Sequence, residues 1–226
     1  MLRLVLFDID GTLIHTSGAG IKAFAKTLEL HFNIANAVEG VKFSGRTDTG
    51  IAREIFSKHG LDPSPENFRL FFDCYVDWLA HMLNENDGDV LPGVRRFIHD
   101  LQSMPEPPAI GLLTGNIRLG AEIKLRHFDL WEFFATGGFG DDHEDRNCIA
   151  AIAHERGSRL VNKKLPGNEV LVIGDTPLDI ACGRAIGAKV LAVATGGSTL
   201  AELQAHRPDW AVTDLEKVRG RELCRL

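Results

Sequence analysis

The sequence predicts an α/β fold, in which a parallel sheet carries helices on both faces and a helical segment is inserted after the first strand. Two observations predict it. Short apolar runs alternate with amphipathic segments from about residue 90 onward, the order typical of a parallel sheet with helical crossovers. Residues 15–85 instead show helical periodicity with no strand-like run. We therefore expect a core domain of residues 1–14 and 86–226 and a helical cap domain of residues 15–85.

Composition limits the classes of partner. The chain has 226 residues, of which 44% are hydrophobic and 25% charged, with a formal net charge of -6. This balance argues against nucleic acid, because no surplus of Lys and Arg neutralises a phosphate backbone. No apolar run approaches the length of a membrane span, and the first residues lack a signal-peptide pattern. We expect a cytoplasmic protein with no nucleic-acid or membrane partner, and its oligomeric state is not predicted.

The cysteines are too widely spaced for a metal or redox motif. No CxxC pair occurs among them, and zinc and redox sites are typically built from such pairs. We expect free thiols in a reducing compartment at the four positions Cys74, Cys148, Cys182 and Cys224.

The first predicted strand, residues 4–7, ends in two carboxylates. Asp8 and Asp10 follow the apolar run, and Gly11 then allows a turn. Residues two apart on a strand project to the same side, and two like charges there are costly unless a cation compensates. A lone aspartate in this position is more often a cap or a turn residue. The pair after a buried strand favours a metal site.

The inserted segment is predicted to be helical. Apolar residues recur at helical spacing over residues 21–32, 49–59 and 68–83. A polar break, Phe43-Ser-Gly-Arg-Thr-Asp48, precedes the second of these helices. Thr47 or Asp48 is a candidate N-cap. Arg46 is a candidate ligand for a substrate carboxylate or phosphate if the segment closes over the sheet.

The second half of the chain alternates between the two kinds of element. Helices are predicted over residues 94–101, 119–128, 148–156, 179–186 and 200–205. Strands are predicted over residues 109–113, 133–136, 170–173 and 190–194, with a last edge strand at 210–212. In such a Rossmann-like sheet ligands bind beyond the carboxyl ends of the strands. Polar motifs at those ends are therefore expected to meet.

Two further motifs follow predicted strands. Thr114, Gly115 and Asn116 come directly before a helix, where hydroxyl and amide donors suit a phosphate; a simple N-cap is the alternative. Asp175 follows the strand at residues 170–173, and Asp179 lies four residues later. A capped helix start with Pro177 in its first turn is compatible with this second motif.

Taken in order, these motifs resemble those of the haloacid dehalogenase-like hydrolase superfamily, whose members are mostly phosphatases. Asp8-Ile-Asp-Gly-Thr12 is similar to its first motif, the segment around Thr114 to its second, and Gly174-Asp-Thr-Pro-Leu-Asp179 to its fourth. The inserted segment resembles the helical cap of the phosphoglycolate phosphatase-like branch. The resemblance extends over most of the chain.

This resemblance implies a Mg²⁺-dependent phosphatase for a small phosphorylated metabolite, of phosphoglycolate or sugar-phosphate type. Asp8 would be the nucleophile that forms an aspartyl-phosphate, and Asp10 the acid and base. Thr114 would bind the phosphoryl group with the backbone after it, at Gly115 and Asn116. The implied Mg²⁺ ligands are Asp8, the carbonyl of Asp10 and Asp175, with Asp179 supporting them from behind.

The third motif departs from the family pattern. The superfamily usually has a lysine upstream of the last acidic motif, whereas this chain offers Arg146. An arginine also neutralises phosphate, although its planar fork differs from a lysine point charge. The alternative is a surface arginine paired with Asp142 or Glu144. Lys163 and Lys164 are less suitable substitutes, because they fall in a predicted solvated turn.

Other functions remain as alternatives. A phosphomutase of the same superfamily shares these motifs, and a non-catalytic phosphate-binding or regulatory protein is compatible with the departure at Arg146. A haloacid dehalogenase is disfavoured because that branch lacks the second acid, here Asp10. A phosphonate hydrolase would need a cap lysine that forms a Schiff base, and Lys22 and Lys26 look like ordinary helix-surface residues.

Overall fold

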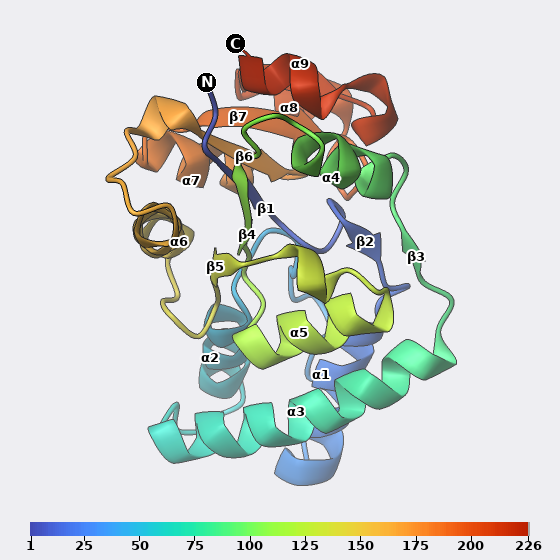
Figure 1. The fold of residues 1–226 in the computed structure, drawn as a ribbon. Coiled ribbons are helices and arrows are strands. Elements are labelled where there is room, and N and C mark those ends of the chain that lie inside the picture. Colours follow the sequence, from blue (N-terminus) through green and yellow to red (C-terminus); the bar gives the residue numbers. More distant parts are fainter. Residues whose placement is uncertain (226) are drawn as a thin grey trace.

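A six-stranded parallel sheet forms the centre of the computed structural model, which describes residues 1–225 (Figure 1). The strand order is β5-β4-β1-β6-β7-β8. The strands are β1 (Leu4–Phe7), β4 (Ala109–Leu113), β5 (Thr136–Gly138), β6 (Val170–Gly174), β7 (Lys189–Val193) and β8 (Trp210–Val212). Strand β1 pairs in parallel with β4 on one side and β6 on the other. The three strands that precede the acidic and Thr114 motifs are therefore neighbours.

Helices cover both faces of the sheet (Figure 1). Alternate residues of β1 enter different apolar clusters, because successive side chains of a strand point to opposite faces. Val5 and Phe7 pack with α4 (Val94–Gln102), α5 (Arg118–His127) and α9 (Gly220–Arg225). Leu4 and Leu6 pack with α6 (Arg146–Leu160) and α7 (Pro177–Ala185). The short helix α8 (Leu200–Ala205) packs near β7 and β8.

Residues 15–85 contain three helices whose apolar cluster also takes in Ile117, Ile123 and Phe128 from in and around α5. These are α1 (Ala19–Phe32), α2 (Asp48–Lys58) and α3 (Pro65–Glu85), and they lie beyond one end of the sheet in Figure 1. Phe24 of α1 packs edge-to-face on Phe71 and Tyr75 of α3, with ring centroids 4.9 and 4.8 Å apart. The two chain crossings pair as the antiparallel strands β2 (Ile14–His15) and β3 (Asp89–Val90).

The predicted fold class is confirmed, but the strand predicted at residues 133–136 is wrong. Phe133 belongs to a 3₁₀ turn, Trp131–Phe133, and the strand is Thr136–Gly138. Phe133 and Phe134 are not part of the sheet, but they pack against its apolar cluster, which explains the apolar run in the sequence. Strand β5 contains two glycines, and at Gly138 the reason is the closeness of α6. A Cβ on Gly138 would come within 2.6 Å of the Ile149 carbonyl oxygen.

Three further details differ from the expectation. Helix α6 begins at Arg146, two residues before the predicted start, because Asp145 caps it by accepting a hydrogen bond from the Asn147 amide at 2.8 Å. The β2–β3 pair and helix α9 were not predicted. Both lie in short polar stretches with no clear periodicity.

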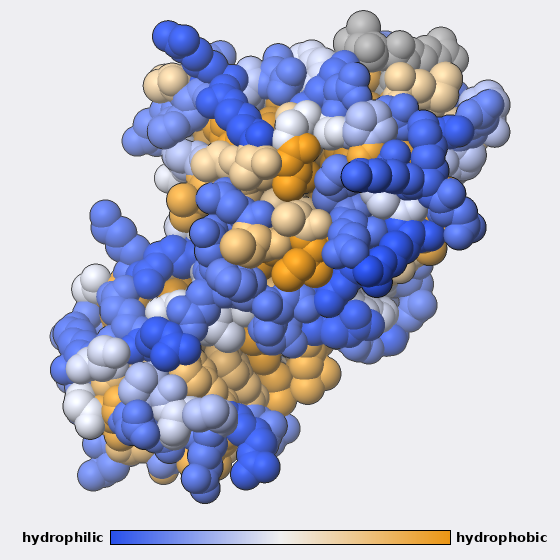
Figure 2. All heavy atoms as spheres, turned by 90° about the vertical axis from the view of Figure 1, so that its left-hand side faces the viewer, coloured by the Kyte–Doolittle hydropathy of each residue, from blue (hydrophilic) through white to orange (hydrophobic). Residues whose placement is uncertain are grey.

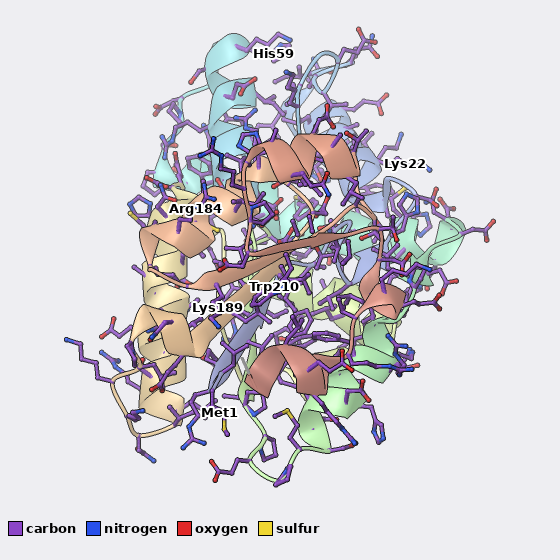
Figure 3. All side chains as sticks on the ribbon, turned by 90° about the horizontal axis from the view of Figure 1, so that it is seen from above. Met1, Lys22, His59, Arg184, Lys189 and Trp210 are labelled. Atoms are coloured by element: carbon purple, nitrogen blue, oxygen red, sulfur yellow. The ribbon has the colours of Figure 1, made fainter. Side chains whose placement is uncertain are left out.

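The outer edge of the sheet is protected by side chains. Strand β8 is the edge strand that the sequence predicts. Lys189 of β7 and Trp210 of β8 lie close together in Figure 3, with the ammonium 5.6 Å from the ring centroid. An exposed strand edge invites pairing with other chains, and a cation beside it opposes such pairing.

Most of the surface in Figure 2 is hydrophilic, and its outline narrows between the sheet and the helical segment. Within residues 1–225, no helix combines the length and the apolar composition needed to cross a bilayer. Cys74, Cys148 and Cys182 are free thiols. The remaining cysteine, Cys224, lies outside the side chains that the structure describes.

Candidate active site

A cavity of about 490 Å³ lies where the predicted motifs converge. Its floor is formed at the carboxyl ends of β1, β4 and β6. Ligands of parallel sheets bind at this edge, beside the strand from which the strand order runs in opposite directions, here β1. Its roof comes from the helical segment and combines polar residues and glycines with aromatic and aliphatic side chains. The roof residues include Ile21, Phe24, Phe43, Ile51 and Tyr75.

Three buried carboxylates meet on the floor. Asp8, Asp175 and Asp179 each offer an oxygen within 4.8 Å of the others. Burial raises the pKa of Asp8 to about 7, with the Asp179 charge adding to the rise and the Arg146 guanidinium opposing it. Burial and the charges of Asp179 and Asp8 raise the pKa of Asp175 to about 8. Like charges held this close favour a bound cation, so this donor set fits a hard divalent ion.

In this cluster, both carboxylate oxygens of Asp179 accept hydrogen bonds from protein groups. One oxygen accepts hydrogen bonds from the Thr176 amide at 2.9 Å and the Thr176 hydroxyl at 2.7 Å, which forms the capping box of α7. The other accepts from Arg146. Asp175 accepts a single hydrogen bond, from Thr12 at 3.1 Å. Asp8 and Asp175 are therefore the carboxylates better placed to bind a cation.

Arg146 is buried in the site rather than lying on the surface. Its guanidinium donates to Asp179, lies 3.6 Å from an Asp8 oxygen and donates to the Gly45 carbonyl at 3.1 Å. Burial opposes its charge, yet Asp179 and Asp8 hold the pKa of Arg146 above its ordinary value. The alternative of a surface pair with Asp142 or Glu144 is not what the structure contains.

The neighbours proposed for that surface pair have other partners. Asp142 pairs with Arg156 at 2.5 Å, and Glu144 pairs with Arg53 at 2.7 Å. Lys163 pairs with Glu169 at 2.9 Å outside the cavity. Lys164 is exposed and lies outside the cavity too. Neither lysine can take the position of Arg146 without a large movement of the chain.

Thr114 is fully buried at the end of β4. Its hydroxyl oxygen accepts from the Asn116 amide at 3.2 Å and from the Asn116 side chain at 2.8 Å. Because the oxygen acts as acceptor twice, the hydroxyl hydrogen remains available for an oxygen in the cavity. Gly115 and Asn116 line the same cavity, just before α5 begins.

Lys124 is a site residue that the sequence analysis missed. Its ammonium lies 2.7 and 2.9 Å from the two carboxylate oxygens of Asp10 and 2.6 Å from the Asn116 side-chain oxygen. A lysine in an amphipathic helix ordinarily faces water, so the sequence of α5 did not indicate that Lys124 is a site residue. The available signal was its helical spacing from Gly120 and Ala121, which places it on the buried face.

The segment around Arg46 joins the helical segment to the sheet. The Asp48 amide donates to the Gly115 carbonyl at 2.8 Å, and an Asp48 carboxylate oxygen accepts from the Ile117 amide at 2.9 Å. Burial, opposed by the Lys124 charge, raises the pKa of Asp48 to about 7. Arg46 lines the cavity, but its guanidinium pairs with Glu54 at 2.6 Å. It would have to exchange this partner to bind a ligand.

The glycine-rich loop after β7 closes over Asp175. Thr195 donates to the Gly11 carbonyl at 2.6 Å, and a Cβ on Gly196 would lie 1.7 Å from an Asp175 oxygen. No side chain fits at residue 196 without displacing that carboxylate. Gly197 differs, because a Cβ there would meet the nearest atom, the Ser44 hydroxyl, at 3.7 Å.

Gly196→Ala is expected to weaken divalent-metal binding at least tenfold, because it pushes Asp175 out of position. Isothermal titration with Mg²⁺ measures this change directly. Gly197→Ala is the matched control and should bind the ion as the unmodified chain does. Equal affinities in the two variants would show that Asp175 holds no metal.

The parallel sheet, the acidic motifs at the carboxyl ends of its strands and the helical roof define an α/β protein with a buried acidic site. The model of the haloacid dehalogenase-like hydrolase family matches residues 5–193. The chain belongs to this family, and the resemblance inferred from its motifs is confirmed.

Relatives support the same assignment. The chain is 26% identical over 213 residues to the pyrophosphatase PpaX of Bacillus mycoides, covering 93% of this chain and 92% of that protein. A crystal structure of a predicted phosphoglycolate phosphatase from Haemophilus somnus has a TM-score of 0.74 at 17% identity, covering 98% and 96% of the two chains. CbbY from Rhodobacter sphaeroides, solved with phosphate, has a TM-score of 0.75 at 16% identity, covering both chains fully.

Proposed function

We propose that this chain is a Mg²⁺-dependent phosphatase that hydrolyses a small phosphorylated metabolite through an aspartyl-phosphate. The observation that carries the proposal is the position of Asp8, buried at the end of the central strand. It borders the cavity with Asp175 beside it and Arg146 3.6 Å away. Family membership and the PpaX relative support hydrolysis of a phosphorylated substrate.

Each step of the reaction falls to a residue around the cavity. Asp8 attacks phosphorus, Asp10 protonates the leaving oxygen, and Asp10 then removes a proton from the water that hydrolyses the aspartyl-phosphate. Thr114 and Arg146 bind the phosphoryl oxygens, which carry the charge in the transition state. Asp8, the carbonyl of Asp10 and Asp175 would hold Mg²⁺, which would supply Lewis-acid neutralisation of that charge.

The helical segment, residues 15–85, acts as a cap that excludes bulk water and selects the leaving group. The cavity beneath this cap has a volume of about 490 Å³, which suits a small molecule. The names of the relatives suggest pyrophosphate and phosphoglycolate as substrates to try first. Sugar phosphates are the third class to try.

Phosphate release from pyrophosphate, phosphoglycolate, sugar phosphates and nucleotides tests this function. We expect turnover with Mg²⁺, and a fall of at least about 100-fold after EDTA treatment that added Mg²⁺ reverses. Product analysis by phosphorus NMR separates hydrolysis from a phosphomutase reaction, which moves the phosphoryl group to another hydroxyl. Phosphate binding without turnover on any substrate would contradict the proposal and favour a non-catalytic binder.

A further inference from the structure

Lys124 is a buried cation for which the reaction above gives no role. The residue is 4% exposed, although it is part of a helix whose other face meets water. An ammonium removed from water is costly unless it is paired with an acceptor of opposite charge. Its contacts with the Asp10 carboxylate and Asn116 meet that requirement, and all three of its hydrogens are used by them.

These contacts fix the orientation of the Asp10 carboxylate. Asp10 lies three residues beyond the end of β1 and lines the cavity, and its side chain is 42% exposed. Lys124 contacts both of its oxygens, and the Asn116 side chain donates to one of them at 2.8 Å. Because Asn116 also donates to Thr114, the carboxylate and the Thr114 hydroxyl are held in one network.

The helical segment completes the enclosure of Lys124. A Cβ on Gly20 of α1 would lie 3.5 Å from the ammonium and 3.7 Å from the Tyr75 hydroxyl of α3, so both groups border the same small space. Lys124 itself belongs to α5, which packs on the sheet. The ammonium is thus held by one part of the chain and covered by another.

We propose that Lys124 is a positioning residue that aligns the Asp10 carboxylate with the leaving oxygen and then with the attacking water. The inference rests on the proposed function, in which Asp10 carries those protons. Without Lys124 the exposed carboxylate keeps a single contact, to Asn116, and samples orientations that do not reach the leaving oxygen. Reactions that need a proton on the leaving group should therefore suffer most.

Lys124→Met tests this with two kinds of leaving group. For an alkyl phosphate such as phosphoglycolate, whose alkoxide needs a proton, kcat/KM is expected to fall about 100-fold, the lower end of general acid–base effects. For p-nitrophenyl phosphate, whose phenolate leaves without a proton, we expect kcat/KM to change by less than about threefold, because kcat/KM reports the steps up to release of the leaving group and not the later hydrolysis that both substrates share. Lys124→Gln, which retains a donor for one oxygen, should fall between the two on the alkyl substrate.

A double-variant cycle locates the effect. Asp10→Asn should show the same preference for the aryl substrate, and adding Lys124→Met to it should cost little more, because residues acting through one another are non-additive. Lys58→Met, an exposed lysine at the end of α2, is the control. Thermal melts establish that each variant is folded.

The possible results distinguish a failure of the positioning role of Lys124 from a failure of the proposed phosphatase function. Equal losses on both substrates in folded Lys124→Met, or losses that add to those of Asp10→Asn, would overturn the positioning role. Leaving-group dependence in Asp10→Asn with none in Lys124→Met would overturn it while keeping the proposed function. No such dependence in Asp10→Asn would overturn the acid role of Asp10, and the inference with it.

Discussion

Asp8→Asn is expected to lower kcat for phosphate release by at least about 10⁴-fold, the scale seen when a catalytic nucleophile or its activating partner is removed. An amide has nearly the shape of the carboxylate but cannot form the aspartyl-phosphate. Steady-state phosphate release measures the loss. Acid quenching after mixing with a ³²P-labelled substrate measures the intermediate, which should be trapped on the unmodified chain and missing from the variant.

Loss of folding cannot account for this result. Burial raises the pKa of Asp8 to about 7, so the charged form is the unfavourable one in the folded chain. A neutral side chain removes that cost, and the melting temperature of Asp8→Asn is expected to equal or exceed that of the unmodified chain at pH 8. Asp73→Asn, on the exposed side of α3, is the matched control. An Asp8→Asn variant with ordinary turnover would refute the nucleophile.

Removal of Arg146 should affect both activity and stability. Arg146→Met leaves Asp8 and Asp179 buried with no cation beside them, and breaking such a buried pair typically costs about 3–5 kcal/mol. We expect the free energy of unfolding, measured in urea, to fall by that amount. We expect kcat/KM to fall by about 10²- to 10³-fold, because a donor to the phosphoryl oxygens is lost.

Arg146→Lys separates charge from geometry. It keeps the charge that most of the superfamily uses, but one ammonium cannot reach Asp179 and the Gly45 carbonyl as the two guanidinium nitrogens do. We expect most of the stability to return and activity to recover in part. Arg159→Met, at the exposed end of the same helix, should change neither quantity. Unchanged activity in Arg146→Met would exclude this residue from phosphoryl binding.

The sequence predicted the parts of the site that follow strands. Asp8, Thr114 and Asp175 come after apolar runs, and parallel pairing forces the carboxyl ends of neighbouring strands together. Each motif can be found from a few neighbouring residues, and the pairing of the strands then determines that the motifs meet. It was sufficient to bring into one cavity three motifs that are spread along the chain from residue 8 to residue 175.

The remainder depends on packing that no local pattern encodes. The helix around Lys124 was predicted, but the placement of this side chain beneath α1 is a tertiary fact. Gly137 and Gly138 were left outside the predicted strand, although they belong to β5, where α6 leaves no room for a larger residue at position 138. Arg46 was a candidate ligand residue and lines the cavity, but its pairing with Glu54 of α2 depends on the tertiary fold.

Several contacts between the helical segment and the rest of the chain use backbone groups on the sheet side. The Asp48 amide meets the Gly115 carbonyl, the Thr49 hydroxyl meets the Gly140 carbonyl, and a Cβ on Gly115 would lie 2.1 Å from the Arg46 carbonyl oxygen. These contacts constrain Gly115, Asp48 and Thr49, and none of them involves the apolar residues that line the roof of the cavity. The residues lining the roof can therefore diverge while the alignment of roof and floor persists, and specificity can evolve in this architecture without rebuilding its catalytic machinery.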